Sequence, residues 1–335
     1  MKRLLCFVMA ALMVVLAVSC KKDPKGHDPS VKTMMATGIG ARSAFLNAQF
    51  DFADARQVVS SYGFYLGTSE DSQDTYIPGD GPIDGNNAYS VKITDLAPET
   101  QYWYKAYAEL DDKTLSGDVK SFRTDPIPER AVDLGIVMTR DDGTTYHLYW
   151  AECGIGRDGF LDSPKYYGNF YAWGETEIKS EYTWNTYAFG ASASGPLSKY
   201  NTDDNKNVLD TGSDGDDVAS KILGGKWRLP TDEEWAALLN NCTWEWTDTE
   251  FYPYASGGFF TSKIEGYKDR RIYLSAGGYK DGLGLHDDRI GHYWSSSLNM
   301  DNPGQAWYVD FNRDNVRRVS GDRCCGQSVR PVYED

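Results

Sequence analysis

The sequence predicts a mainly β chain with two folded domains, a β-sandwich followed by an α+β domain. Its 335 residues include 33 glycines and 23 tyrosines, a composition that favours short strands and loops over helix bundles. Apolar and polar residues alternate from residue 31 to about residue 124, and this period of two is typical of half-buried strands. The clearest helical period is that of residues 231–239.

Residues 1–20 have the layout of a secretory signal. Met1-Lys2-Arg3 is basic, and residues 4–18 form an apolar run too short for a comfortable membrane span. The ending Leu-Ala-Val-Ser-Cys resembles a bacterial lipobox, which implies a lipoprotein signal peptide and lipidation of Cys20. An ordinary cleaved signal is the alternative. We therefore expect an exported outer membrane lipoprotein on the cell surface, with residues 21–32 as a flexible polar tether.

Residues 33–125 are predicted to form the β-sandwich. Clusters of Gly, Asp and Pro separate its strand-like segments, which include residues 45–50, 62–67 and 102–108. Residues 96–102, Leu-Ala-Pro-Glu-Thr-Gln-Tyr, resemble the corner before strand F of fibronectin type III domains. The resemblance implies a fibronectin-like sandwich, which we expect to act as a spacer, with sugar binding by its aromatics as the alternative. Asp125-Pro126-Ile127-Pro128 predicts a stiff linker.

Residues 130–335 are predicted to form the α+β domain, with its main helix at 231–239. Thr231 can cap this helix, and Glu234 completes a capping box. Trp235, Leu238 and Leu239 share one face of the helix, so we expect that face to be buried.

Four blocks of the second domain together resemble a known family. They are YAWGE at 171–175, GKWRLPTDEEW at 225–235, YWSSS at 293–297 and SVRPV at 328–332. The resemblance is to the Fibrobacter succinogenes major paralogous domain family, and it runs from about residue 131 to residue 332. It implies a C-type-lectin-like fold, related to that of formylglycine-generating enzymes. From it we expect a recognition or adhesion module, not an enzyme, that binds a protein or glycan.

Charge and motifs argue against several other functions. The formal net charge of −15, with no long basic cluster, argues against nucleic-acid binding. Residues 154–159 match a dinucleotide-binding glycine pattern, but no helix is predicted after them, so we expect no cofactor. His286-Asp287-Asp288 with His292 could begin a metal site, yet zinc needs three or four converging ligands and we predict none. Calcium binding near the acidic residues 210–217 stays open.

The C-terminal hairpin is the predicted binding surface. Trp307, Val309 and Phe311 alternate with Tyr308, Asp310 and Asn312, which predicts an inward apolar face and an outward polar face. Residues 312–315 predict a turn, and 316–319 a return strand. One exposed surface is therefore expected to hold Tyr308, Asp310, Arg313, Asp314, Arg317, Arg318, Ser320, Asp322, Arg323, Cys324 and Cys325.

The adjacent cysteines allow more than one hypothesis. Some C-type-lectin-like proteins are diversified near their C-terminus by retroelements, and residues 316–326 contain only residue types that such diversification yields. Free drift of a surface loop is the alternative. A copper-dependent oxidoreductase of the formylglycine-generating type would use Cys324 and Cys325, but adjacent side chains on a strand point to opposite faces. For the function of the whole protein, a structural surface or fimbria-associated component is a third hypothesis. Cys153 and Cys242 could form a disulfide.

Overall fold

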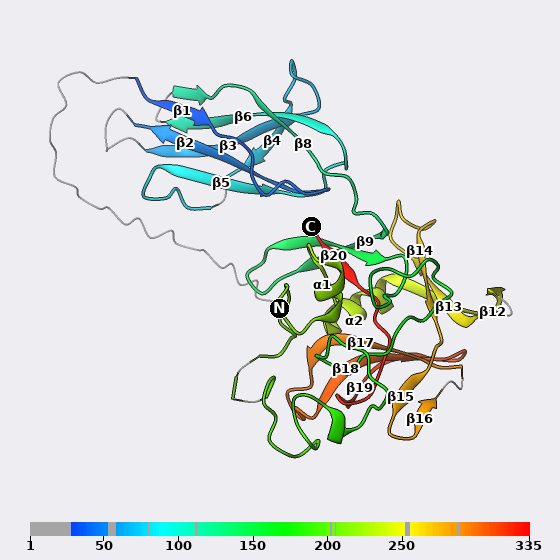
Figure 1. Cartoon of the computed structure of the whole chain (residues 1–335). Helices are drawn as coiled ribbons and strands as arrows, with labels where there is room; N and C mark the ends of the chain where they lie inside the picture. The colour runs from blue at the N-terminus through cyan, green and yellow to red at the C-terminus, as the bar shows by residue number, and fades with distance from the viewer. Residues whose placement is uncertain are drawn as a thin grey trace, which may run out of the picture. The chain divides into compact units, whose positions relative to one another are not determined.

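The computed structural model describes residues 28–52, 58–79, 81–110, 113–201, 203–204, 206–251, 255–286 and 289–335 (Figure 1). The predicted signal segment with Cys20, and residues 21–27 of the predicted tether, lie outside the described residues. The chain divides into two compact units. Among the described residues, unit 1 comprises those within 28–39, 44–93 and 100–123, and unit 2 comprises those within 40–43, 94–99 and 124–335.

Unit 1 consists of two antiparallel sheets. One has the strand order β1-β2-β5, and the other has the order β4-β3-β6, with β7 and β8 both paired to β6. This is the pairing of a fibronectin-like β-sandwich, as the sequence predicted. The strands are β1 (Ser30–Thr33), β2 (Ala44–Asp51), β3 (Val59–Gly67), β4 (Thr75–Pro78), β5 (Ala88–Ile93), β6 (Gln101–Leu110), β7 (Lys113–Ser116) and β8 (Lys120–Arg123).

Alternating residues of both sheets form the core of unit 1. Leu46 of β2, Phe64 of β3 and Tyr104 of β6 are all fully buried. Tyr102, at the end of the predicted corner, is also buried, and its ring stacks on that of Phe122 with centroids 5.6 Å apart. The period of two in the sequence therefore reflects burial between two sheets.

Unit 2 contains four small antiparallel sheets and two α-helices in its described part. The sheet orders are β11-β20-β10-β9, β12-β13-β14, β15-β16 and β17-β18-β19. The strands are β9 (Ala131–Thr139), β10 (Thr145–Ala151), β11 (Trp227–Arg228), β12 (Cys242–Phe251), β13 (Ala255–Ser262), β14 (Arg271–Ser275), β15 (Tyr279–Asp281), β16 (Gly284–His286), β17 (Gly291–Leu298), β18 (Gln305–Phe311), β19 (Val316–Asp322) and β20 (Val332–Glu334). The helices are α1 (Val218–Leu223), α2 (Asp232–Asn241) and the 3₁₀ turn η1 (Trp184–Thr186).

Helix α2 begins as the sequence predicts. The Thr231 side chain accepts a hydrogen bond from the Glu234 N–H, and the Glu234 carboxylate accepts one from the Thr231 N–H, so the capping box is complete. Trp235 and Leu238 are fully buried, and Leu239 packs against the same core from a half-buried position. The predicted helix and its buried face are both confirmed.

The four blocks that suggested a family meet in the core of unit 2. Trp173 Nε1 donates to the Ser295 carbonyl, and Trp294 Nε1 donates to the Tyr171 carbonyl, each at 2.8 Å. Trp235 Nε1 donates to the Trp294 carbonyl at 3.3 Å, which adds the third block. The fourth block joins through a β-bridge from Ser328 to Tyr293. The blocks are therefore parts of one structural framework.

The C-terminal strand β20 lies inside a sheet. It pairs with β10 on one side, where Leu148 lies opposite Glu334, and with β11 on the other, where Trp227 lies opposite Tyr333. Arg330, just before β20, is fully buried and donates to the carbonyls of Ala151, Glu152 and Tyr273 at 3.1, 2.6 and 2.8 Å. The end of the chain is thus fixed to three other segments of unit 2.

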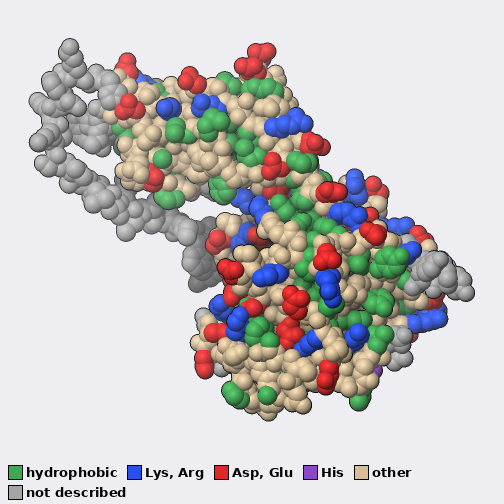
Figure 2. All heavy atoms as spheres, viewed as in Figure 1, with side chains coloured by type: hydrophobic (Ala, Val, Ile, Leu, Met, Phe, Trp, Pro, Cys, Tyr) green, Lys and Arg blue, Asp and Glu red, His purple; other side chains and the backbone are tan. Residues whose placement is uncertain are grey.

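The surface seen in Figure 2 mixes charges of both signs. Acidic and basic side chains are interspersed on that face, with apolar side chains between them. Among the described residues, no helix is both long and apolar enough to cross a membrane.

Candidate functional site

The predicted binding residues lie on both faces of the β18–β19 hairpin. Cross-strand pairs in this hairpin include Gln305 with Asp322, Trp307 with Ser320, and Asp310 with Arg317. Because side chains alternate along a strand, the first two pairs project from one face and the third from the other, together with Tyr308. The expectation of one exposed surface that holds all the predicted residues is therefore wrong.

The first face has a half-buried network that we call the tryptophan–aspartate surface. Trp184 Nε1 and Gln305 Nε2 donate to the two carboxylate oxygens of Asp322, at 3.3 and 3.4 Å. Ser320 Oγ donates to Gln305 Oε1 and accepts from Asn299 Nδ2, each at 3.1 Å. The members, all half-buried, are Trp184, Asn299, Gln305, Trp307, Ser320 and Asp322.

Trp307 belongs to this surface and not to the buried core. The sequence places it inward with Val309 and Phe311, and the structure buries only those two. Helix α2 reaches the hairpin where Arg318 contacts Asp232, with Nη1 2.5 Å from the carboxylate. Trp307 lies opposite Ser320, which is the next pair on the same face after Val309 and Arg318. This pair lies beyond the point where α2 contacts Arg318.

The second face bears a stack of rings. Tyr279 lies parallel to His286 on one side and to His292 on the other, with centroids 4.6 and 4.5 Å apart. Tyr308 packs on His292 with centroids 4.8 Å apart. The ring faces of Tyr279 and His292 are thus occupied by protein.

Asp310 connects this stack to β19. Its carboxylate lies 3.3 Å from His292 Nε2 and accepts a hydrogen bond from Arg317 Nε at 2.7 Å. The contact with His292 and then that with Arg317 hold the pKa of Asp310 below its usual value, against the effect of burial. The predicted residues Tyr308, Asp310 and Arg317 are therefore close together, but largely engaged with one another and with His292.

The metal hypothesis for the histidines does not fit this geometry. The Tyr279 ring separates His286 from His292, so the two imidazoles cannot bind one ion. His286 Nε2 contacts Asp281 at 2.9 Å, and Asp287 and Asp288 lie outside the described residues. In the described part of the chain, no group of three or more His, Cys, Asp or Glu side chains could hold a metal.

The acidic stretch 210–217 is engaged in local structure. Asp217 accepts from the backbone N–H of Ser220 at 2.9 Å and of Leu229 at 2.8 Å, and so caps helix α1. Asp216 accepts from Lys199 Nζ at 2.9 Å and from the Tyr200 hydroxyl at 2.7 Å. These carboxylates therefore have protein partners.

The turn of the hairpin is exposed, as predicted. The N–H of Asn312 donates to the carbonyl of Asn315 at 2.9 Å and closes the turn. Arg313 and Asp314 project into solvent there, and Arg313 pairs with Asp248 of β12. Arg318 is also exposed, beside Asp232.

Arg323 and Cys324 are buried, which contradicts their expected place on an exposed surface. The Arg323 guanidinium lies 4.6 Å from the Trp173 ring, among Tyr187, Phe189 and Tyr200. It donates to the Tyr187 hydroxyl and to the carbonyls of Tyr200, Pro303 and Lys199, at 2.8, 2.9, 3.0 and 3.2 Å. Cys324 packs with Phe170, Tyr182 and Tyr187. Both residues are parts of the framework, so we do not expect free variation at either.

The other thiols of unit 2 are free. Cys153 and Cys242 are both buried and do not form the disulfide that the sequence left open. Cys325 is half-buried beside Cys324.

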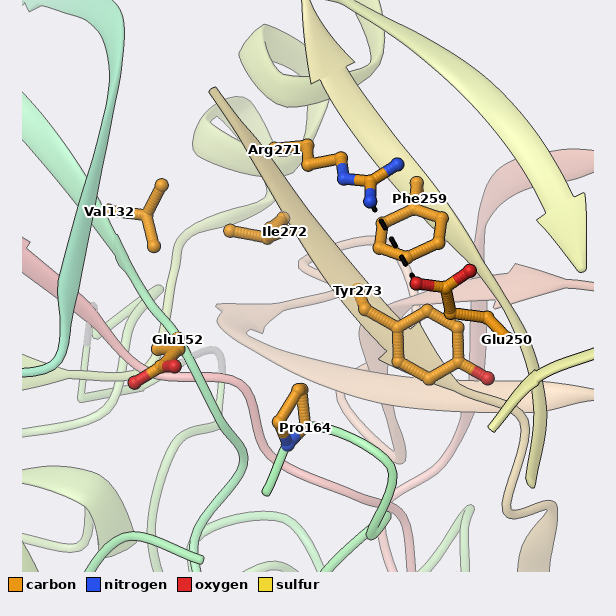
Figure 3. Close-up of a pocket in the computed structure, with 8 residues that line it drawn as sticks. All are labelled: Val132, Glu152, Pro164, Glu250, Phe259, Arg271, Ile272 and Tyr273. Atoms are coloured by element: carbon orange, nitrogen blue, oxygen red, sulfur yellow. Dashed lines mark ion pairs between the residues drawn. The ribbon is translucent and has the colours of Figure 1, made fainter. Parts of the chain in front are cut away.

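A small hollow lies elsewhere in unit 2, over β13 and β14 (Figure 3). Its volume is about 230 Å³, and it is lined by Val132, Glu152, Pro164, Glu250, Phe259, Arg271, Ile272 and Tyr273. The Arg271 guanidinium lies 3.9 Å from the centre of the Phe259 ring and 3.9 Å from the Glu250 carboxylate. Its cation is thus already paired, and the hollow has none of the predicted site residues.

Comparison with known proteins gives similarities of limited extent. No protein-family model matches the chain, and no curated protein matches it. The sensor domain of the anti-sigma factor RsgI4 of Pseudobacteroides cellulosolvens is similar over 31% of this chain and 100% of its own, at 17% identity and a TM-score of 0.24. The sixth fibronectin type III domain of human fibronectin type III domain containing protein 3 is similar over 33% of this chain and 93% of its own, at 22% identity and a TM-score of 0.25. Fibronectin type III domains are thus among the solved structures to which the chain is similar.

Proposed function

We propose that the chain is a lipid-anchored recognition protein of the cell surface. In this proposal unit 2 is a C-type-lectin-like domain of the Fibrobacter succinogenes major paralogous kind, and the tryptophan–aspartate surface binds the ligand. Unit 1 acts as the spacer, and Cys20 is the site of lipidation. The meeting of the four sequence blocks in one core supports the family assignment.

One observation supports the binding role most directly. Two half-buried indoles, Trp184 and Trp307, lie beside a linked carboxylate, hydroxyl and two amides on adjacent segments. Indoles supply large contact area at low cost in conformational entropy, and planar polar groups supply directional hydrogen bonds. Such a set suits a protein or glycan ligand that has both apolar and hydroxyl-bearing faces.

The surface is held in place before any ligand arrives. Asp322 directly precedes the buried Arg323, and Gln305 and Trp307 lie on β18, which pairs with a strand on each side. Fixed side chains lose less entropy on binding, so this arrangement favours affinity. The opposite face is less suited, because the faces of Tyr279 and His292 are covered by other rings.

Binding by matched variants tests the proposal. The full chain is screened against a glycan array and a panel of extracellular proteins, and each hit is measured again with Trp184→Ala and Trp307→Ala. We expect each to weaken binding at least about tenfold with an unchanged melting temperature. Tyr166→Ala, which removes an exposed aromatic outside this surface, is the control and should bind normally. Hits that survive both tryptophan changes would place the ligand elsewhere.

A further inference from the structure

Cys324 and Cys325 lie in a turn and not in a strand. Strand β19 ends at Asp322. The N–H of Cys325 donates to the carbonyl of Asp322 at 3.1 Å, which closes a turn with Arg323 and Cys324 at its centre. The alternation of side chains along a strand therefore does not apply to this pair. The two thiols interact with each other, and this interaction is the main cause that lowers the pKa of Cys324 and raises the pKa of Cys325.

Both ends of the cysteine pair are fixed. On one side Arg323 is fully buried and makes four hydrogen bonds. On the other side Gly326 exchanges two backbone hydrogen bonds with Lys280 of β15, each at 2.8 Å. Only the two cysteines lie between these anchors, so their backbone is held in place, and the two neighbouring thiols interact with each other. Such proximity favours reaction with each other over reaction with a second external molecule.

The four cysteines of unit 2 differ in their expected reactivity. Burial raises the pKa of Cys153, and raises the pKa of Cys242 to about 12, so both stay protonated thiols near neutral pH. The buried Cys324 has a lowered pKa, whereas Cys325 is half-buried and within reach of solvent but has a raised pKa. The pair therefore places a stabilised thiolate, that of Cys324, beside a thiol that solvent can reach, that of Cys325, and neither Cys153 nor Cys242 has such a partner.

We propose that Cys324 and Cys325 form a reversible redox site, which closes a vicinal disulfide by exchange with a small-molecule disulfide. One thiolate of the pair attacks the small disulfide, forms a mixed disulfide and releases one small thiolate. The second protein thiol loses its proton to water and attacks the protein sulfur, which releases the second small thiolate. Two protein thiols are oxidised and one small disulfide is reduced to two thiols.

The adjacency of the pair makes this disulfide labile. Consecutive Cα atoms are about 3.8 Å apart, whereas ordinary disulfides join Cα atoms about 4.4–6.8 Å apart. The eight-membered ring is consequently strained, and strained disulfides are the readily reduced, regulatory ones. The site lies beside the tryptophan–aspartate surface, because Asp322 is the first residue of the same turn.

Peptide mapping of the full chain tests the proposal. The folded protein is incubated with oxidised glutathione, alkylated with iodoacetamide and digested with trypsin without reduction. Cleavage after Arg323 releases a peptide that begins at Cys324 and contains no other cysteines than the pair. We expect this peptide to be lighter by two hydrogens and free of alkyl groups, and to become doubly alkylated after treatment with dithiothreitol. Cys153 and Cys242 should be alkylated only after unfolding, and so report that the chain was folded.

The variant Cys324→Ser is the matched control. It retains the accessible Cys325 without a partner, so we expect a stable glutathione adduct on that residue. Wild-type protein that accumulates the same adduct without ring closure would overturn the proposal. The proposal would also be overturned if oxidised glutathione, at a concentration that modifies the variant, left both cysteines of the wild-type protein open to alkylation.

Discussion

Replacing Arg323 with methionine should strongly destabilise unit 2. Methionine is of similar length and apolar, so the change removes the hydrogen bonds with little loss of volume. It leaves the carbonyls of Tyr200, Pro303 and Lys199 without their donor, and each such loss costs about 1–3 kcal/mol. Two of the three bonds are only partly buried, so water can replace some of them. We therefore expect a loss of about 3–5 kcal/mol, out of about 5–15 kcal/mol for a typical domain.

Urea unfolding followed by tryptophan fluorescence measures this loss. Trp103 is the one tryptophan of the ten that lies in unit 1, so the signal reports mainly on unit 2. Arg323→Lys retains the charge but not the planar guanidinium, so its free energy of unfolding should lie between those of wild type and Arg323→Met. Arg313→Ala, in the exposed turn, should leave the unfolding midpoint unchanged. An Arg323→Met protein within about 1 kcal/mol of wild type would show that these carbonyls do not depend on the guanidinium.

Three further predictions concern other parts of the chain. Trp235→Ala should lower the free energy of unfolding by about 3–5 kcal/mol, because the Trp235 ring is fully buried and its centroid lies 4.6 Å from that of Trp150. An unchanged melting temperature would contradict this prediction. Burial raises the pKa of Asp217 from 3.8 to about 6, so the folded state binds this proton more tightly than the unfolded state. The contribution of Asp217 to the free energy of unfolding should therefore fall as the pH rises from about 4 to about 6. Urea titrations at several pH values should show this fall in wild type and not in Asp217→Asn. An identical pH dependence in both proteins would refute the prediction. Cys20→Ala should release the protein from the membrane fraction, since lipid is the expected anchor, and extraction that still needs detergent would mean that another segment anchors it.

The parts of the fold that could be predicted are those fixed by neighbouring residues. The cap of α2 needs only Thr231 and Glu234, three residues apart, and the hairpin turn closes between Asn312 and Asn315. The period of two in the first domain likewise records burial in each strand separately. Such features are written within a few residues of sequence, so local patterns reveal them.

The parts that could not be predicted depend on distant partners. A single arginine in a polar stretch is usually exposed, and nothing near Arg323 signals otherwise. Its burial depends on Tyr187 and Tyr200, which lie 136 and 123 residues earlier. Trp184 joins the tryptophan–aspartate surface through Asp322, at a separation of 138 residues. Of this surface the sequence predicted Ser320 and Asp322, because only these two lie in the polar stretch that follows the hairpin turn.

The internal position of β20 determines the order in which the nascent chain can fold. All the strands of unit 1 end by Arg123, so the sandwich can form while the rest is still being synthesised. The four-stranded sheet of unit 2 needs β20 between β10 and β11. Glu334 of β20 pairs with Leu148, which is synthesised 186 residues before it. Until β20 leaves the ribosome, β10 and β11 have no strand between them to pair with. The second unit is therefore completed only after β20 has been synthesised, and removal of residues 332–334 should take away an inner strand of a sheet and not a dispensable segment.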